Sequence, residues 1–406
     1  MRRGVVVVGG APVWREGNEF RVPSGHRRYL EELADAFEHV TYFAAIAPSL
    51  PTGMQLPRAC KPGAVTIEPL RYMDAGPLPK RIALTATDAL RVSRAVGQAQ
   101  RVVHYFPAVG GPLGLAAIRR HARAHVVYLK SDWIAWTKRR AGKGVQRAYW
   151  SATERIEARL ADAMVFRSAT HLERLRPHSP AVLELAQPLL AARANDDEPG
   201  RPPRAEGEPL RVLFVGGLLE AKGLGELMEA AAAIRSEPGV APFRLLLAGG
   251  KDAFAAHESD EIIPGWLRAR MAALGVEDLV EAFGHIDDSE RLSALYRSAD
   301  IMVLPSWTEG FPRVIDEAMS FGLPVVTTTV GGIPDALTHE RDALLVPPKQ
   351  PQALAAALTR LLTSNTCRQT FARAARRSYD ERIKETAAAQ HTRLLEQAWS
   401  TNRARR

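Results

Sequence analysis

The sequence predicts an α/β protein with two doubly wound domains, each built on its own parallel sheet. Its 406 residues exceed what one hydrophobic core usually fills. Short apolar, β-rich runs alternate along the chain with longer amphipathic stretches, a pattern typical of parallel strands joined by crossover helices. Residues 191–209 are rich in Pro, Gly and charge and have no apolar period, which indicates a linker between the two halves.

The individual elements follow from these alternating runs. Strands are expected at residues 4–8, 40–45, 65–69, 101–105, 125–129, 163–167, 211–215, 244–248, 279–283, 301–305, 324–328 and 343–346. Helices are expected at residues 25–37, 80–99, 111–123, 150–160, 223–236, 263–274, 289–298, 312–321, 351–363 and 367–392. We therefore expect an N-terminal domain over 1–190, a linker over 191–209, a C-terminal domain over 210–378, and a final segment, 379–406, that crosses back to the N-terminal domain.

The composition is that of a soluble globular protein, with 46% hydrophobic and 24% charged residues. The two cysteines, Cys60 and Cys367, are far apart and lack the spacing of metal ligands, so neither a disulfide framework nor a zinc site is predicted. No apolar run approaches the roughly 20 residues of a membrane-spanning helix. We expect a cytoplasmic protein that is soluble or attached to the inner face of the cell membrane.

The net charge of +9 indicates anionic partners. No nucleic-acid motif accompanies this charge and aromatic residues make up only 7% of the chain, so nucleic acid is the least favoured partner. Residues 133–150 mix Trp and Tyr with Lys and Arg, as segments at membrane interfaces do. Peripheral contact with an anionic membrane is one interpretation of this segment, and a solvated basic helix with core tryptophans is the other.

Residues 299–326 hold the strongest candidate site. An apolar strand ends in a short loop, and a helix is expected to open at Pro312, a residue suited to the first helical turn. Gly310 lets the backbone approach a ligand, and the free N–H groups of Arg313 and Val314 lie at the positive end of the helix. This arrangement predicts an anion site.

Two glutamates flank this helix start. Glu309 lies in the loop, where its carboxylate can accept hydrogen bonds from sugar hydroxyls, and Glu317 lies more than one turn into the helix. Such a pair is common on solvated helices, but here the whole phrase EGFPRVIDEAMSFGLPVV is in register with a known motif. It resembles the E-x7-E motif of retaining glycosyltransferases of the GT-B fold, specifically those of family 4.

This resemblance implies two Rossmann-like domains that face each other across a cleft, and a hexosyltransferase that uses a nucleotide-sugar donor. It assigns Glu309 to the transferred sugar and Glu317 to the ribose, and places Gly310, Phe311 and Pro312 around the donor. For the acceptor we expect a saccharide or a lipid-linked saccharide, in synthesis of a bacterial surface polysaccharide, because residues 133–150 resemble a segment at a membrane interface. No metal or other cofactor is expected, because helix dipoles and cations take the place of a divalent ion. The acidic pair at residues 287–288 is better explained as a helix cap than as metal ligands.

A second segment, residues 211–224, resembles the family element whose Arg and Lys neutralise the donor diphosphate. Lys222 matches the lysine, whereas Gly217 stands where the family has arginine. Losing a cation next to a diphosphate removes charge-assisted hydrogen bonds unless another group replaces it. Arg313 could replace the missing cation, and the equally favoured interpretation is that Arg313 is an ordinary exposed arginine.

Further donor contacts are implied by glycines and by one histidine. Gly331 and Gly332 follow a strand and resemble the turn that passes close to the phosphates, with a plain tight turn as the alternative. Gly249 resembles the strand-end glycine under the nucleotide. His285 lies in the segment that reads the base edge, where the family contacts are mainly from the backbone.

The N-terminal half resembles the family less closely. Gly25, with His26 and Arg27 beside it, matches the loop before the first helix, where a backbone N–H meets a donor phosphate; a solvated helix start is the alternative. Residues 101–115 resemble an element with two histidines, of which the second lines the active site. His104 occupies the first position and Phe106 the second. His104 is thus a catalytic candidate, and a packed core histidine is the competing interpretation.

The resemblance implies a retaining transfer in which a leaving diphosphate oxygen helps to deprotonate the acceptor hydroxyl. The protein then contributes positioning and charge stabilisation, and needs no nucleophile of its own. Two alternatives remain. The departures at Gly217 and Phe106 allow a degenerate GT-B subunit that binds nucleotide or scaffolds a complex without catalysis. A phosphorylase or synthase of the same fold is less favoured, because no lysine lies in a cofactor-anchoring motif.

Overall fold

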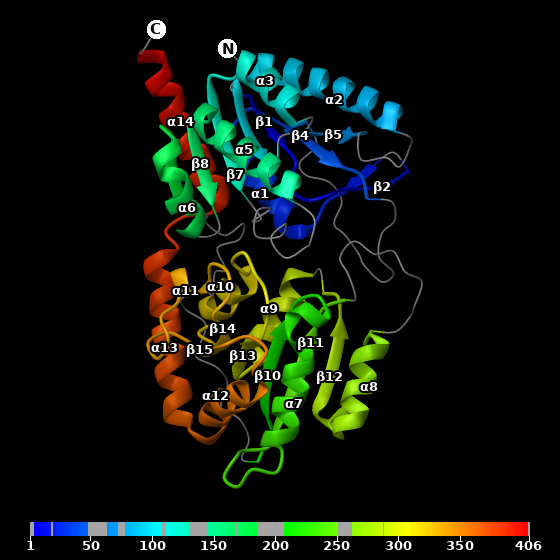
Figure 1. Cartoon of the computed structure of the whole chain (residues 1–406), viewed down its shortest axis with the longest axis vertical. Coiled ribbons are helices and arrows are strands. Elements are labelled where there is room, and N and C mark those ends of the chain that lie inside the picture. Colours follow the sequence, from blue (N-terminus) through cyan, green and yellow to red (C-terminus); the bar gives the residue numbers. More distant parts are fainter. Residues whose placement is uncertain are drawn as a thin grey trace. The chain divides into compact units, whose positions relative to one another are not determined.

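A computed structural model shows two compact units (Figure 1). It describes residues 4–17, 19–47, 63–71, 78–107, 111–129, 144–166, 169–185, 207–250, 262–286 and 288–404. Most of the predicted linker (191–206), most of the basic aromatic segment (133–143) and residue 287 lie outside these ranges. The first unit contains β1 to β9 together with the last helix, α14, and the second contains β10 to α13.

The first unit is built on a seven-stranded sheet whose neighbouring strands all pair in parallel. Its order is β5 (Val65–Leu70), β4 (His39–Ala45), β1 (Gly4–Val8), β6 (Arg101–Tyr105), β7 (Ala124–Leu129), β8 (Ala163–Phe166) and β9 (Val182–Leu185). Every residue of β6, β7 and β8 is buried, as expected of a parallel sheet covered by helices on both faces. A short antiparallel hairpin, β2 (Trp14–Glu16) with β3 (Glu19–Arg21), lies outside this sheet.

The alternation of side chains along β1 explains how both faces of this sheet are filled. Val5 and Val7 belong to one core cluster, and Val6 and Val8 belong to another. Successive side chains of a strand point to opposite faces, so a run of four valines supplies both. The described helices of this unit are α1 (Ser24–Ala36), α2 (Leu78–Ala99), α3 (Gly111–His121), α5 (Gly144–Leu160), α6 (Ala169–Leu175) and α14 (Ala387–Ala404).

The prediction of one helix over residues 367–392 is wrong. The chain forms two helices there, α13 (Asn365–Arg382) and α14, so the expected boundary at residue 378 falls inside α13. Ile383 adopts an extended backbone directly after α13. The Thr386 hydroxyl then accepts a hydrogen bond from the Ala389 N–H at 3.2 Å, which caps the start of α14. No Pro or Gly marks this break, and a threonine cap is a weak signal inside a long polar helix.

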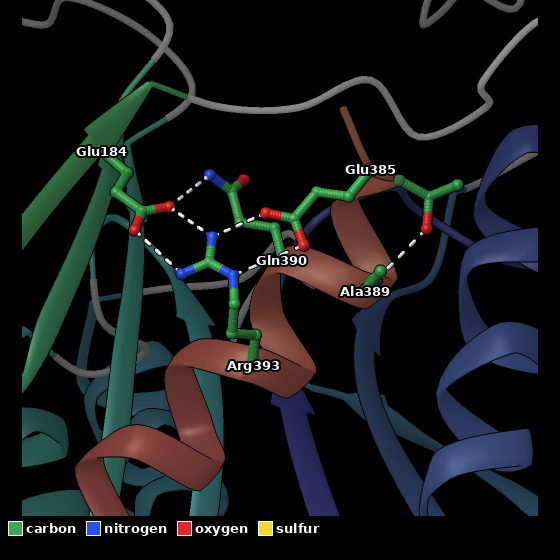
Figure 2. A network of polar contacts seen from close by, with 6 residues as sticks. Glu184, Glu385, Ala389, Gln390 and Arg393 are labelled. Atoms are coloured by element: carbon green, nitrogen blue, oxygen red, sulfur yellow. Dashed lines mark hydrogen bonds and ion pairs between the residues drawn. The ribbon is translucent and has the colours of Figure 1, made fainter. Parts of the chain in front are cut away.

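A polar network holds the start of α14 to β9 (Figure 2). The Arg393 guanidinium of α14 donates to Glu184 of β9 at 2.8 Å and to Glu385 at 2.6 Å. Gln390 donates to the same Glu184 carboxylate at 3.0 Å. The hydrogen bond from Arg393 lowers the pKa of Glu184. Together these contacts attach residues from 385 onward to the first unit, although the chain enters them directly from the second.

The second unit carries a six-stranded sheet, again with every neighbouring pair parallel. Its order is β12 (Val280–Gly284), β11 (Phe243–Ala248), β10 (Leu210–Val215), β13 (Ile301–Leu304), β14 (Val325–Thr328) and β15 (Leu344–Val346). Its other described helices are α7 (Leu224–Ile234), α8 (Gly265–Leu274), α9 (Ser289–Ser298), α10 (Arg313–Ser320), α11 (Ile333–Ala336) and α12 (Pro351–Thr363). The predicted α/β fold with two parallel sheets is confirmed.

The strand order of the second unit places a topological switch point between β10 and β13. From β10 the chain builds β11 and β12 on one side, and then returns to build β13, β14 and β15 on the other (Figure 1). In open parallel sheets, ligands bind outside the carboxyl ends of the strands at such a point. The loops after β10 and β13 are therefore expected to form a ligand site.

Candidate functional site

The loop after β13, residues 305–310, lies between two other backbone segments of the second unit. On one side the Trp307 N–H donates to the carbonyl of Ala221 at 2.9 Å. On the other side the Gly332 N–H donates to the carbonyl of Gly310 at 2.6 Å. The loop is thus hydrogen-bonded both to the segment after β10 and to the turn after β14.

Two glycines make this close packing possible. Gly223 has a φ of 71°, and a Cβ there would lie 2.0 Å from the carbonyl oxygen of Pro305. Gly331 has a φ of 58°, and a Cβ there would lie 2.0 Å from the carbonyl oxygen of Glu309. A side chain at either position would combine left-handed backbone strain with a clash, so only glycine fits. The structure therefore gives Gly331 a role in loop packing besides the predicted phosphate contact.

The Glu309 carboxylate is held through one of its two oxygens. Lys222, from the 3-10 turn Glu220–Lys222, places its Nζ 2.5 Å from Oε1, and the Ser306 hydroxyl donates to the same oxygen at 2.7 Å. The Glu309 side chain is 10% exposed and that of Lys222 is 26% exposed. Among the described residues, both donors bond to Oε1 and none bonds to Oε2. Two site residues that are 87 positions apart in the chain thus meet.

The Glu317 carboxylate has a different partner, which the sequence analysis did not identify. The hydroxyl of Tyr296, in α9, donates to Glu317 Oε2 at 2.8 Å. The tyrosine is 1% exposed, and its ring stacks on Phe321 with 5.3 Å between the centroids. Burial, and then the nearby Glu317 charge, raise the pKa of Tyr296 well above its usual value, so the phenol remains a hydrogen-bond donor at neutral pH.

The helix α10 begins one residue later than predicted. Pro312 has an extended backbone and is the N-cap, and Arg313 is the first helical residue. This arrangement suits proline, which has no N–H to satisfy at the cap. Arg313 is exposed, and Val314 is half-buried. The Arg313 charge acts against the rise in the pKa of Tyr296.

Phe311 is fixed from the end of α13. The Arg382 guanidinium lies over the Phe311 ring, 5.2 Å from its centroid, and forms an ion pair with Asp316 at 2.6 Å. A cation over an aromatic face is stabilising, and more so when partly desolvated. The contact ties the loop before α10 to the last turn of α13.

The ends of β10, β11 and β12 meet at the other side of the switch point. The Gly249 N–H donates to the carbonyl of Gly284 at 2.7 Å, and the residue after Gly284, His285, is exposed. A Cβ at Gly217 would lie 3.6 Å from Leu219 and 3.8 Å from the carbonyl of Gly250, which are ordinary contacts. Gly217 is therefore not required by packing, in contrast to Gly223.

The interpretation of residues 287–288 as a helix cap is supported where the structure describes it. The Asp288 carboxylate accepts hydrogen bonds from the N–H groups of Glu290 at 2.8 Å and Arg291 at 3.2 Å, and so caps α9. Among the described residues, no group of three or more His, Cys, Asp or Glu side chains is arranged to hold a metal ion.

The histidine proposed from the N-terminal half is a core residue. His104 has no exposed surface, and its Nδ1 and Nε2 lie 2.7 Å from His125 Nε2 and Glu157 Oε2, respectively. Both ring nitrogens are therefore occupied by buried partners, and this placement does not fit a contact with a transferred sugar. Phe106, at the second histidine position, is buried against Trp150.

Gly25 lies in the first turn of α1, whereas the family resemblance places it in the loop before the first helix. Gly25 is half-buried, and His26 beside it is buried. The Nε2 atom of His26 accepts a hydrogen bond from the Ala11 N–H at 3.2 Å. His26 thus holds the loop after β1 rather than projecting into solvent.

Residues 209–364 match the family described as glycosyl transferases group 1. This segment is a glycosyl transferases group 1 domain. It includes Lys222, Glu309 and Glu317 together with the glycines between them. Gly25 and His104 lie in the first unit, outside the matched residues.

A relative from Erwinia amylovora, the amylovoran biosynthesis glycosyltransferase AmsK, is 34% identical over 160 residues. That alignment covers 38% of this chain, and the chain spans 36% of the relative's length. The sucrose-phosphate synthase of Thermosynechococcus elongatus is 23% identical and has a TM-score of 0.70, with 98% of this chain and 100% of that one covered. HepE of Anabaena, solved with UDP-glucose, is 16% identical with a TM-score of 0.64, and 98% of this chain and 99% of that one are covered. The structural likeness extends the GT-B fold to both units.

The group 1 domain brings together the acidic and basic residues that the sequence analysis selected in the C-terminal half. Glu309 and Lys222 are in direct contact, and Glu317 lies on α10 directly after the Glu309 loop. Tyr296 and Ser306 were missed, because a tyrosine on a helix and a serine after a strand are ordinary in sequence. Their roles become visible only through hydrogen bonds to the two glutamates.

Proposed function

We propose that this chain is a retaining glycosyltransferase that moves a sugar from a nucleoside diphosphate sugar to an acceptor hydroxyl. The observation that carries the proposal is the contact of Lys222 with Glu309 at the carboxyl edge of the group 1 domain, one loop away from Glu317. A cation, a sugar-binding carboxylate and a helix start meet there, as a diphosphate sugar requires. HepE, which shares the fold, was crystallised with UDP-glucose.

The proposed chemistry needs no protein nucleophile. The bond from the anomeric carbon to the diphosphate breaks, the acceptor oxygen bonds to that carbon on the same face, and the acceptor proton passes to the departing diphosphate oxygen. Lys222 and the free N–H groups at the start of α10 stabilise the charge that develops on the diphosphate. Glu309 accepts hydrogen bonds from the sugar through its Oε2, and Glu317 accepts from the ribose.

The donor site in this proposal works without a metal ion or another cofactor. Lys222 is paired with Glu309, and the exposed Arg313 is the first residue of α10. They would carry the charge neutralisation that a divalent ion supplies elsewhere. Addition of EDTA is expected to leave turnover unchanged, and restoration of lost turnover by Mg²⁺ or Mn²⁺ would refute this part.

For the acceptor, we propose a saccharide or lipid-linked saccharide in the synthesis of a bacterial surface polysaccharide. The similarity to AmsK, named for amylovoran biosynthesis, supports this class. The described part of the chain contains no helix that is long and apolar enough to cross a membrane. We propose peripheral attachment at the inner face of the cell membrane, with residues 133–150 as the contact. Flotation with anionic liposomes tests it, and equal binding after removal of the charges of Lys138, Arg139 and Arg140 would refute it.

The activity is tested by incubating the purified protein with UDP-, GDP-, ADP- and TDP-sugars and a panel of saccharide acceptors. Release of the nucleoside diphosphate is followed, and NMR of the product gives the anomeric configuration. Transfer with retention, lost in a Glu309→Gln variant, is expected. An inverted product would refute the retaining mechanism.

A second candidate function is a nucleotide-binding or scaffolding subunit without transferase activity. Two observations favour it: Gly217 stands at the arginine position of the related enzymes, and His104 is buried among protein partners. Nucleotide binding without transfer or hydrolysis of any donor in the same panel would establish this alternative. Failure to bind any nucleoside diphosphate would refute both the transferase and the nucleotide-binding subunit.

A further inference from the structure

The two glutamates of the site are held in the same manner by different groups. In each carboxylate one oxygen is occupied by protein donors, and among the described residues no protein donor is assigned to the other. For Glu309 the donors are Lys222 and Ser306, both on Oε1. For Glu317 the donor is Tyr296, on Oε2. The donors differ in charge, because the Tyr296 phenol is neutral whereas the Lys222 ammonium is positive.

Tyr296 is itself rigid. Its side chain is buried against the core of the second unit, with only 1% of its surface exposed. Its ring stacks nearly parallel on Phe321, with an interplanar angle of 7°, and the Arg297 guanidinium lies over the other ring of this pair, 5.7 Å from the Phe321 centroid. A hydroxyl on so constrained a ring has one position, so it fixes the oxygen to which it donates.

A glutamate carboxylate turns freely about its last torsion, which has broad rather than staggered minima. A single strong hydrogen bond from a fixed donor removes that freedom before a ligand arrives, and so lowers the entropy cost of binding. The Tyr296 phenol donates a single hydrogen bond to Oε2, and Oε1 of Glu317 can accept others. Arg313, which faces the same pair from the start of α10, is exposed and does not bond to Glu317 in the structure.

We propose that Tyr296 is a positioning residue that holds Glu317 Oε2 and thereby presents Oε1 to the ribose hydroxyls of the nucleotide. The inference rests on the proposed function, since it takes the ligand of Glu317 to be the ribose of a nucleotide-sugar donor. It adds to that function a specific means by which the site selects ribose over deoxyribose.

The test compares nucleoside diphosphates with and without ribose hydroxyls by titration calorimetry. UDP, 2′-deoxy-UDP and 3′-deoxy-UDP are titrated into the wild-type chain and a Tyr296→Phe variant, and the GDP and ADP series are used if UDP does not bind. Tyr296→Phe keeps the ring and its stacking and removes only the hydroxyl. We expect UDP affinity to fall by about tenfold or more, as for a lost hydrogen bond to a charged group, and the preference for UDP over the deoxy compounds to fall with it.

Two further variants keep the result interpretable. Glu317→Asp withdraws the carboxylate by one methylene, breaks the same contact from the other side and leaves the core tyrosine in place, so it should lose the same preference. Tyr29→Phe removes a matched buried hydroxyl, bonded to His391 at 2.7 Å in the first unit, and should leave nucleotide binding unchanged. A double variant of Tyr296→Phe with Glu317→Gln should bind no more weakly than Glu317→Gln alone.

Kinetics give a second readout, because a contact to ribose stabilises the bound donor and the transition state equally. Tyr296→Phe should raise the KM for the donor and leave kcat within about twofold. Equal weakening of UDP and both deoxy compounds would indicate a merely structural tyrosine and overturn the inference. Wild-type affinity in Tyr296→Phe would overturn it as well. Absence of nucleotide binding in the wild-type chain would instead remove the proposed function on which it rests.

Discussion

Replacing Glu309 by Gln is expected to tighten the binding of a nucleoside diphosphate while it abolishes transfer. In the structure Lys222 Nζ is bound to Glu309 Oε1 at 2.5 Å, so the lysine must leave or share this partner to neutralise a diphosphate. Gln keeps the shape of the side chain and removes its charge. The lysine is then released from an ion pair, and a negative charge near the phosphates disappears.

The size of the effect follows from the exposure of the pair. A hydrogen bond between charged groups contributes about 1.5–3 kcal/mol, and exposure to solvent reduces this. Because Lys222 is 26% exposed and Glu309 is 10% exposed, we take about 1 kcal/mol. That corresponds to roughly fivefold tighter UDP binding. Loss of a contact that orients the reacting sugar should lower kcat by about 100-fold or more.

Calorimetric titration with UDP and a transfer assay measure the two effects separately. A Ser306→Ala variant is the matched control, since it removes the hydroxyl that donates to the same Oε1 at 2.7 Å and leaves both charges of the Lys222–Glu309 pair in place. Because the charges at the site are unchanged, this variant should not show the tighter UDP binding expected of Glu309→Gln. Weaker UDP binding in Glu309→Gln would refute the competition between carboxylate and diphosphate for Lys222. Undiminished transfer by Glu309→Gln would refute the contact between Glu309 and the transferred sugar.

Three other perturbations test the site and its support. Gly223→Ala should destabilise the second unit by at least about 2 kcal/mol in urea unfolding, because of its φ of 71° and the clash with the loop, whereas Gly225→Ala, in α7 with nothing within 4 Å, should stabilise it by about 0.5–1 kcal/mol. The Cβ of Gly217→Arg has room, and the new side chain adds a cation near the diphosphate, so the KM for the donor should fall by about threefold or more. An unchanged KM would show that residue 217 does not lie near the donor phosphates. Burial lowers the pKa of His391 from its usual 6.5 to about 3, so the folded state excludes a proton that the unfolded chain binds, and the stability present above pH 6.5 is lost as the pH falls toward 3. The free energy of unfolding, obtained from melting curves, should fall by about 1–2 kcal/mol between pH 7 and 5, and by less in His391→Gln. Identical pH profiles for the two proteins would contradict the lowered pKa of His391.

The strands were predictable because their signal is local. Each buried strand of a parallel sheet is a short apolar run, and the alternating valines of β1 belong to two separate cores as period-two geometry requires. Shorter elements such as β9 and α6 carry too few residues to show a period, and they were not predicted. The break between α13 and α14 was missed because it depends on the Thr386 cap and on the attachment of Arg393 to Glu184, which is 209 positions away.

The sequence by itself determined the two-sheet α/β class and the loop-helix segment from Glu309 to Glu317, because both are written in contiguous residues. Tertiary structure alone decided what those residues touch. It joined Lys222 to Glu309, supplied Tyr296 as the partner of Glu317 and enclosed His104 among His125 and Glu157. Such contacts arise when parallel strands bring distant loops to one edge of a sheet, and no local pattern specifies them.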